Sequence, residues 1–274
     1  MTGIDVSKHQ GVIDWSKVKT DFAILRAGFG RYTSQKDPQF ERNYAGAKAA
    51  GIPVGAYWYS YAKSAEEARE EAKACLQVLK GKRFEFPIYI DIEDSTQGHL
   101  SRATLTAICE AFCDTLEKAG YFAGVYASTY WFTSKIDHAR LAGKYTIWLA
   151  DYRAGYNKTL KRDMHQYTSN GHEDGISGRV DRNTCTRDLP GIIKKAGLNG
   201  FGKADKPLAG ENGAQAASYT REIGPAARED WTRLADKAEA LGLRVNAKLT
   251  IGPMTGGDDA AIQALATELG LKCT

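Results

Sequence analysis

The feature that most constrains the fold is an alternation of short apolar runs and helical patterns along the first two thirds of the chain. The apolar runs are rich in Val, Ile, Tyr and Phe, and few alternate with polar residues, as is typical of strands covered on both faces. Helical patterns separate the early strands but not the last three, so we expect an α/β fold, an irregular (βα)5β3 TIM-like barrel. The eight predicted strands are residues 3–6, 22–27, 54–60, 87–93, 122–127, 146–150, 164–168 and 178–181.

A glycine-rich stretch divides the chain of 274 residues. Residues 197–213 contain five glycines and Pro207, a composition typical of a linker between domains. We therefore expect a barrel over 1–196, a linker over 197–213, and a small α/β domain of βαβαβ order over 214–274. A sheet that small has an exposed edge, which is suited to pairing with a second copy of the chain.

Charge and hydropathy exclude several classes of protein. The net charge of +4 is too mild to indicate nucleic acid binding, and no apolar run approaches the roughly 18 residues of a membrane helix. Residues 1–10 include Asp5 and Lys8 and lack the apolar core of a signal peptide, so we expect synthesis in the cytoplasm. The five cysteines are accordingly expected to be reduced thiols.

Two acidic residues end the fourth predicted strand. Asp91 and Glu93 are two residues apart, a spacing that on a strand places both side chains on one face. Barrel enzymes carry their reacting groups at the carboxyl ends of strands. Two close carboxylates cannot both ionise freely, so one retains a proton, and such a pair is the chemical requirement for glycoside hydrolysis. The alternative interpretation is a solvated acidic strand end.

Two further aspartates are expected at the same rim. Asp5 lies near the end of the first predicted strand and Asp181 at the end of the eighth, and these strands are neighbours in a closed barrel. Lone aspartates at strand ends are more often turn residues. The convergence of several strand ends on one rim is what singles out these two.

Several motifs, each weak alone, are specific in combination. They are Gly3-Ile4-Asp5-Val6-Ser7, Ile13-Asp14-Trp15, Gly55-Ala56-Tyr57, Asp91-Ile92-Glu93, His165-Gln166-Tyr167-Thr168 and Val180-Asp181-Arg182-Asn183. Through these motifs the chain resembles, over residues 3–190, the lysozymes of glycoside hydrolase family 25, the muramidases found in phage endolysins and bacterial autolysins. The resemblance implies an irregular barrel of five βα units plus three strands.

The resemblance implies a lysozyme that needs no cofactor or metal and cleaves the β-1,4 bond between N-acetylmuramic acid and N-acetylglucosamine in peptidoglycan. Glu93 matches the general acid, which protonates the leaving oxygen and then activates water. Asp91 matches the carboxylate that assists the substrate's own 2-acetamido group. Asp5 and Asp181 match the remaining acidic positions, for which we expect positioning and electrostatic tuning of Glu93.

Aromatic side chains near strand ends are expected to line a groove for the glycan. An aromatic residue in a strand is more often part of the core than a sugar platform, but three of the four candidates match family positions. Trp58 is expected to point to the opposite face, toward the helices. The predicted substrate contacts are Tyr57, Tyr59, Tyr126, Trp148 and Gln166.

Two other functions stay open: a non-catalytic module that binds cell-wall glycan, and a metal-dependent hydrolase that uses the same four carboxylates. The expected partners are a glycan strand of peptidoglycan, the bacterial cell wall through residues 214–274, and a second copy of the chain, with no nucleic acid and no insertion into a membrane. The lack of a signal peptide suggests an endolysin made in the host cytoplasm, which acts on the wall after release.

Overall fold

The computed structural model describes residues 1–155 and 158–202. The chain divides into two compact units, Met1–Gly210 and Glu211–Thr274, and the described residues belong to the first. The small α/β domain predicted over 214–274 lies outside the described residues, as does Cys273. Within the described part, four cysteines are free and buried, and no helix is long and apolar enough to cross a membrane.

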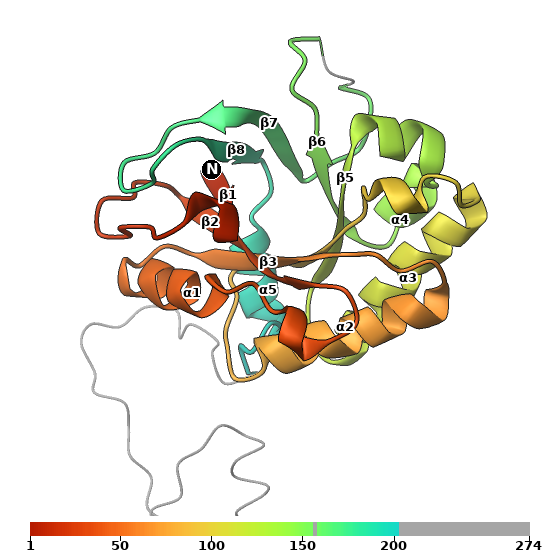
Figure 1. The fold of residues 1–274 in the computed structure, drawn as a ribbon, viewed down its shortest axis with the longest axis horizontal. Helices are drawn as coiled ribbons and strands as arrows, with labels where there is room; N and C mark the ends of the chain where they lie inside the picture. The colour runs from red at the N-terminus through yellow and green to blue at the C-terminus, as the bar shows by residue number, and fades with distance from the viewer. Residues whose placement is uncertain (156–157, 203–274) are drawn as a thin grey trace, which may run out of the picture. The chain divides into compact units, whose positions relative to one another are not determined.

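Eight strands close into a barrel in chain order, which confirms the prediction of an eight-stranded α/β barrel (Figure 1). The first seven strands run parallel, and β8 is antiparallel to its neighbours β7 and β1. The strands are β1 (Thr2–Val6), β2 (Phe22–Phe29), β3 (Val54–Tyr59), β4 (Ile88–Asp91), β5 (Ala123–Ser128), β6 (Thr146–Ala150), β7 (Met164–Gly171) and β8 (Val180–Cys185).

Helices follow β2, β3, β4, β5 and β8. The connection from β1 to β2 contains only a 3-10 turn, which differs from the five consecutive βα units expected from the sequence. Ser64 and Ser101 cap α2 and α3 by accepting backbone N–H groups of the first turn. The α-helices are α1 (Phe40–Ala49), α2 (Ala65–Leu79), α3 (Arg102–Lys118), α4 (His138–Ala142) and α5 (Leu189–Ala196), and the short turns are η1 (Lys8–Gln10), η2 (Thr33–Gln35), η3 (Ser95–Gln97) and η4 (Trp131–Lys135).

The buried side chains form two layers because successive strand residues point to opposite faces. Phe22 and Ile24 of β2 belong to the cluster inside the barrel, whereas Ala23 and Leu25 belong to the layer between strands and helices. Trp58 lies in the outer layer, fully buried, and its indole N–H donates to the Gly30 carbonyl oxygen at 2.9 Å. Its predicted orientation toward the helices is confirmed.

The eighth strand is displaced along the sequence from its predicted position at 178–181, because it runs over Val180–Cys185. Asp181 therefore stands near the beginning of β8 and not at its end. Because β8 is antiparallel to β1, its beginning lies at the rim where β1 ends, and Asp181 pairs in register with Asp5. The two aspartates meet as predicted, but through an antiparallel strand pair.

The barrel extends beyond the predicted boundary at residue 196. Gly197 ends α5 in a left-handed conformation, with φ 68°. Asn199, fully buried, donates its side-chain amide to the Phe86 carbonyl oxygen (2.8 Å) and accepts the Phe122 N–H (2.6 Å). The first glycines of the predicted linker thus end a helix and turn the chain back onto the barrel, and the remainder, 203–213, lies outside the described residues.

Candidate active site

The structure brings all four predicted carboxylates to one rim of the barrel. Asp5 lies on β1, Asp181 on β8 and Asp91 at the last position of β4. Their proximity is expressed in their pKa values: Glu93 and Asp5 each raise the pKa of Asp91, and Asp181 raises the pKa of Glu93. The convergence inferred from strand ends is therefore present in the folded chain.

Asp91 and Glu93 occupy different environments. The strand was predicted to run to residue 93, but β4 ends at Asp91, so Glu93 lies just beyond it. Asp91 is 4% exposed, and its pKa is raised first by burial and then by Glu93. Glu93 is exposed, yet enough protein surrounds its carboxyl that desolvation is the main cause of its raised pKa, followed by Asp181 and Asp94. Close carboxyls of this kind share protons.

Asp5 and Asp181 form a second carboxyl pair. Burial and the charge of Asp181 raise the pKa of Asp5 well above its usual range. A hydrogen bond between two carboxyls requires a proton, and this one favours the protonated form of Asp5 and the ionised form of Asp181. The pKa of Asp181 is nevertheless raised overall, because burial outweighs that hydrogen bond.

A network of amides fixes the Asp5 side chain. Gln166 Nε2 and Asn183 Nδ2 both donate to Asp5 Oδ2 at 2.8 Å. Asn183 Oδ1 accepts the indole N–H of Trp148 at 2.8 Å, and Gln166 Oε1 accepts the Tyr126 hydroxyl at 2.9 Å. Each amide oxygen is held by an aromatic donor, and this determines which way each amide points its N–H groups.

The predicted substrate contacts therefore divide into two groups. Trp148 is 1% exposed and Gln166 and Tyr126 are also buried, and all three belong to the amide network around Asp5. Tyr126 also lines a cavity beside Glu93, and the contact of these three residues with substrate stays a prediction. Tyr57 and Tyr59 are half-buried on β3. The charges of Asp5 and Asp91 act on the Tyr57 hydroxyl, and the Tyr59 hydroxyl donates to Asp94 Oδ2 at 3.1 Å.

Sequence reasoning missed four residues at this rim. Asn183 lies inside a quoted motif, but nothing in the sequence pairs it with Asp5. Tyr130 and Tyr152 are 60% and 52% exposed. Both come two residues after a strand, β5 and β6, and that position is the signal that could have identified them. Arg26 points inward from β2 and is the fourth.

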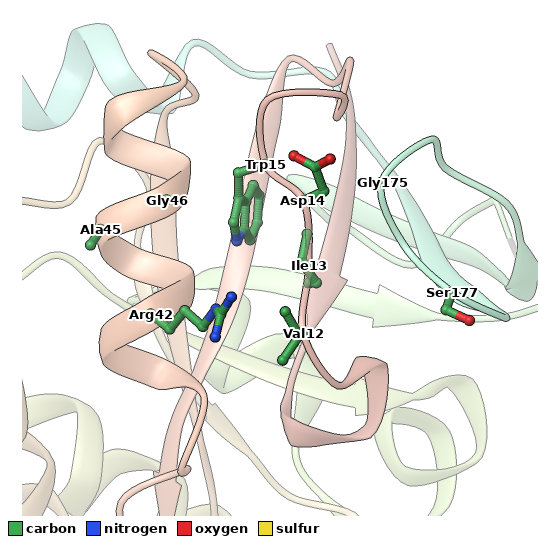
Figure 2. A pocket seen from close by; sticks show the side chains of 9 residues that line it. All are labelled: Val12, Ile13, Asp14, Trp15, Arg42, Ala45, Gly46, Gly175 and Ser177. Carbon is green, nitrogen blue, oxygen red and sulfur yellow. The ribbon is translucent and has the colours of Figure 1, made fainter.

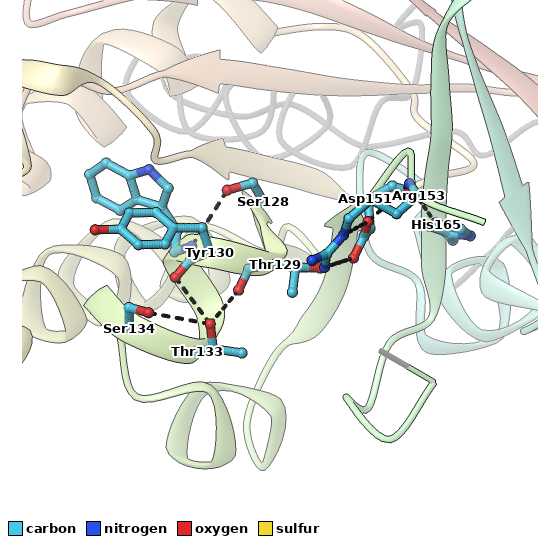
Figure 3. Close-up of polar contacts among 9 residues, drawn as sticks. Ser128, Thr129, Tyr130, Thr133, Ser134, Asp151, Arg153 and His165 are labelled. Atoms are coloured by element: carbon cyan, nitrogen blue, oxygen red, sulfur yellow. Dashed lines mark hydrogen bonds and ion pairs between the residues drawn. The ribbon is translucent and has the colours of Figure 1, made fainter. Parts of the chain in front are cut away.

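A cavity of about 510 Å³ lies beside Glu93, between the ends of β5 and β6. Figure 3 shows its polar wall, in which Arg153 binds Asp151 through two nitrogens (2.8 and 2.5 Å) and Thr129 donates to Asp151 (2.7 Å). The hydrogen bonds from Arg153 are the main reason why the pKa of Asp151 lies well below its usual range. Asp151 is therefore an ionised structural partner and not a proton donor.

Another cavity, of about 570 Å³, lies where α1 faces residues 12–15 (Figure 2). Its lining includes Trp15 and Gly46 and carries only two charged side chains, Asp14 and Arg42. It contains no cluster of carboxylates, so the rim beside Glu93 is the better candidate for chemistry. Among the residues that the structure describes, no group of three or more His, Cys, Asp or Glu side chains is arranged to hold a metal ion.

We compared the chain with protein families, with known sequences and with solved structures. The profile described as Glycosyl hydrolases family 25 matches residues 4–176. The uncharacterized protein YegX of Escherichia coli O6:H1 is 30% identical over 208 residues, which cover 70% of this chain and 72% of YegX. The solved structure of a bacterial lysozyme from Streptomyces coelicolor is 27% identical with a TM-score of 0.62, and the match covers 72% of this chain and 96% of that one.

A third relative is longer than the matched region. The autolysin LytC from Streptococcus pneumoniae, solved in complex with a synthetic peptidoglycan ligand, is 28% identical with a TM-score of 0.59. The match covers 66% of this chain but only 46% of LytC, so the chain spans about half the length of that relative.

Proposed function

The chain belongs to the glycosyl hydrolases of family 25, and from this premise we propose that it is a lysozyme that hydrolyses peptidoglycan. The bond it cleaves is the β-1,4 bond between N-acetylmuramic acid and N-acetylglucosamine. The observation that carries the proposal is the pairing of an exposed Glu93 of raised pKa with a buried Asp91 at the rim of the barrel. The solved complex of LytC with a peptidoglycan ligand supports the substrate class.

Glu93 is the general acid and base of this mechanism. Burial and the charge of Asp181 raise its pKa, which favours the protonated form, and its exposure lets it reach the glycosidic oxygen. Protonation of that oxygen allows the bond to the leaving sugar to break. In the second step the resulting Glu93 carboxylate removes a proton from the attacking water, which restores the starting state.

Asp91 assists the acetamido group of the sugar on the other side of the broken bond. The acetamido carbonyl oxygen attacks the anomeric carbon, and positive charge develops on the amide as the leaving sugar departs. Asp91 accepts the amide N–H and stabilises that charge. Its Oδ1 atom is buried and has no hydrogen-bond partner among the described residues, so its capacity to accept a hydrogen bond is unused in the free protein.

The variant Glu93→Gln tests this proposal with purified cell walls as substrate. Wild type is expected to reduce the turbidity of the walls, and the variant to be slower by about 10²- to 10⁴-fold, because a general acid contributes that much to the rate. Glu66→Gln, on the exposed face of α2, is the matched control and retains the wild-type rate. Equal rates for Glu93→Gln and wild type would exclude the assigned role.

The turbidity assay also tests the two alternative functions, a non-catalytic module that binds cell-wall glycan and a metal-dependent hydrolase. A wild-type protein that binds walls without clearing them supports the non-catalytic binding module. Activity that a chelator abolishes and an added divalent cation restores supports the metal-dependent hydrolase. Full activity in the presence of a chelator is the result expected for the carboxylate mechanism.

We also propose that residues 214–274 bind the cell wall or join two copies of the chain, and that the protein acts as a phage endolysin. Light scattering of the full chain beside a chain shortened after Gly202 tests the pairing of copies. A monomeric full chain excludes the dimer, and equal wall binding by both chains excludes a role in attachment. For the endolysin role, we expect expression inside a bacterium to cause lysis only when the cell membrane is permeabilised.

A further inference from the structure

Tyr152 belongs both to the surface of the site and to its buried network. It follows β6 by two residues and lines the cavity beside Glu93. The side chain is exposed, whereas its hydroxyl donates to the buried Gln166 Oε1 at 2.7 Å. The same residue therefore presents a ring to the cavity and a hydroxyl to the amide network behind it.

The backbone around Tyr152 is fixed by both of its neighbours. The Asp151 N–H donates to the Gln166 carbonyl oxygen at 3.1 Å, and the Asp151 carbonyl oxygen is hydrogen-bonded to His165 Nε2 at 2.9 Å. The Asp151 carboxylate binds the side chain of Arg153, on the other side of Tyr152 (Figure 3). A side chain held between two anchored residues has few directions open to it, so the tyrosine is preorganised.

Gln166 transmits the contact to a carboxyl group. Its Oε1 atom accepts the hydroxyls of Tyr152 and Tyr126 at 2.7 and 2.9 Å, and its Nε2 atom donates to Asp5 Oδ2 at 2.8 Å. An amide oxygen has room for two donors, and its NH2 group must point the opposite way. The two hydroxyls thus favour the orientation in which Gln166 donates to Asp5.

Asp5 is in turn connected to both reacting carboxyls. It pairs in register with Asp181 across β1 and β8 and shares a hydrogen bond with it. Asp5 raises the pKa of Asp91, and Asp181 raises the pKa of Glu93. The orientation of Asp5 therefore influences the groups that act on the substrate.

We propose that the Tyr152 hydroxyl is a positioning group that connects the cavity beside Glu93 with the Asp5–Asp181 pair. The hydroxyl fixes the Gln166 amide that holds Asp5, and the ring contacts the sugar that fills the cavity. A sugar seated against the ring restricts the tyrosine and so stabilises the orientation of Asp5 that the reaction uses. This inference rests on the proposed function, because it assigns the cavity to a sugar of the glycan strand.

The first test measures kcat and KM of Tyr152→Phe and Tyr152→Ala on soluble peptidoglycan fragments. Phenylalanine keeps the ring and removes the hydroxyl, so KM should stay near the wild-type value while kcat falls roughly two- to tenfold, the range of one hydrogen bond. Alanine also removes the ring and is expected to raise KM. A higher KM in Tyr152→Phe with unchanged kcat would mean that the hydroxyl binds substrate directly. That result, or wild-type constants in Tyr152→Phe, overturns the proposal.

The variant Gln166→Leu shows whether the hydroxyl acts through the amide. Leucine fills a similar volume and removes both the acceptor and the donor, so adding Tyr152→Phe should lower kcat no further. An equal loss of kcat with and without Gln166 would refute the assigned route. Tyr32→Phe is the matched control, because Tyr32 is an exposed tyrosine that is not among the residues lining this cavity. It should retain the wild-type kcat, and thermal unfolding verifies that each variant folds.

A second readout needs neither turnover nor the Gln166→Leu background. The side-chain ¹⁵N–¹H signals of Gln166 report its hydrogen bonds, and they should shift in Tyr152→Phe but not in Tyr32→Phe. Addition of a glycan fragment should shift them less in Tyr152→Phe than in wild type, and equal shifts in the two proteins refute the connection. A wild type that releases no sugar ends refutes the proposed function, whatever the amide signals show, so the two failures are distinguishable.

Discussion

At the scale of single residues, the acidic side chains of the site differ in their protonation and in their hydrogen bonds because their neighbours differ. Asp151 is ionised because Arg153 binds both of its oxygens. The pKa of Asp5 is raised because this residue is buried beside Asp181, although two amides donate to it. Asp91 has an oxygen with no partner among the described residues. The surroundings, more than the residue types, determine which carboxyl meets a substrate.

Asn183 provides a test of the amide network. Asn183→Ala removes a donor from Asp5 and leaves the buried Trp148 indole N–H without its acceptor. We expect a loss of stability of about 1–3 kcal/mol from the unsatisfied N–H, together with reduced kcat, because Asp5 loses its fixed orientation. Urea unfolding and steady-state kinetics measure the two effects. Asn170→Ala, on an exposed part of β7, is the control, and a variant with wild-type stability and kcat would show that the network is dispensable.

The acidic residues of the site could be predicted from the sequence because each lies near an end of an apolar strand or just beyond it, and strand ends in a barrel converge. Asn183 and Arg26 could not, because their contacts depend on how the strands pair in the folded barrel. The burial of Trp148 could not be predicted either, because the sequence does not indicate whether an inward-facing aromatic residue lies at the rim of the barrel or below it.

At the scale of elements, two connections determine how the site is assembled. The antiparallel β8 brings Asp181 beside Asp5, and the bulge in β2 brings Phe29 onto Arg26. Neither the direction of the last strand nor the bulge has a local sequence signal strong enough to predict it. The number and order of the strands were predictable, because eight apolar runs and their helix caps are local features.

Asn199 tests the closure of the barrel at the strand beginnings. Asn199→Ala leaves the Phe86 carbonyl and the Phe122 N–H without partners and places an alanine at φ 56°. We expect a loss of about 3 kcal/mol or more in the free energy of unfolding, measured in urea. The same substitution at the exposed Asn170 should cost less than about 0.5 kcal/mol. An equally small cost at Asn199 would mean that residues 197–201 do not stabilise the barrel.

Glu71 of α2 makes stability depend on pH. It is fully buried, accepts the Tyr61 N–H at 2.9 Å, and burial raises its pKa from 4.5 to about 7. Because the folded state binds the proton more tightly, its contribution to stability is complete below about pH 4.5 and is lost as the pH rises to about 7.

We therefore expect Glu71→Gln to gain up to about 3 kcal/mol in stability relative to wild type between pH 4.5 and 7.5. The measurement is urea unfolding of both proteins across this range, and the change in their difference is the predicted quantity. Glu70→Gln, at an exposed position of α2, controls for the removal of a charge. Parallel stability curves for Glu71→Gln and wild type would contradict a buried carboxyl of raised pKa.

At the scale of the whole molecule, the described barrel carries a complete candidate site. The four carboxylates, the amide network and the cavity beside Glu93 all come from residues of the first compact unit. The glycines at 197 and 200 suggested a boundary from composition alone, but their left-handed backbone serves to return the chain to the barrel. Composition alone does not distinguish a glycine of a linker from a glycine that forms a turn within the domain.

The most direct test of the central claim is mass spectrometry of the sugar ends released from purified peptidoglycan. Digestion by the full chain, followed by reduction with borohydride, should yield fragments that end in reduced muramic acid, and Glu93→Gln should release none above background. Fragments that end in reduced glucosamine, or equal release by Glu93→Gln and wild type, would contradict the account.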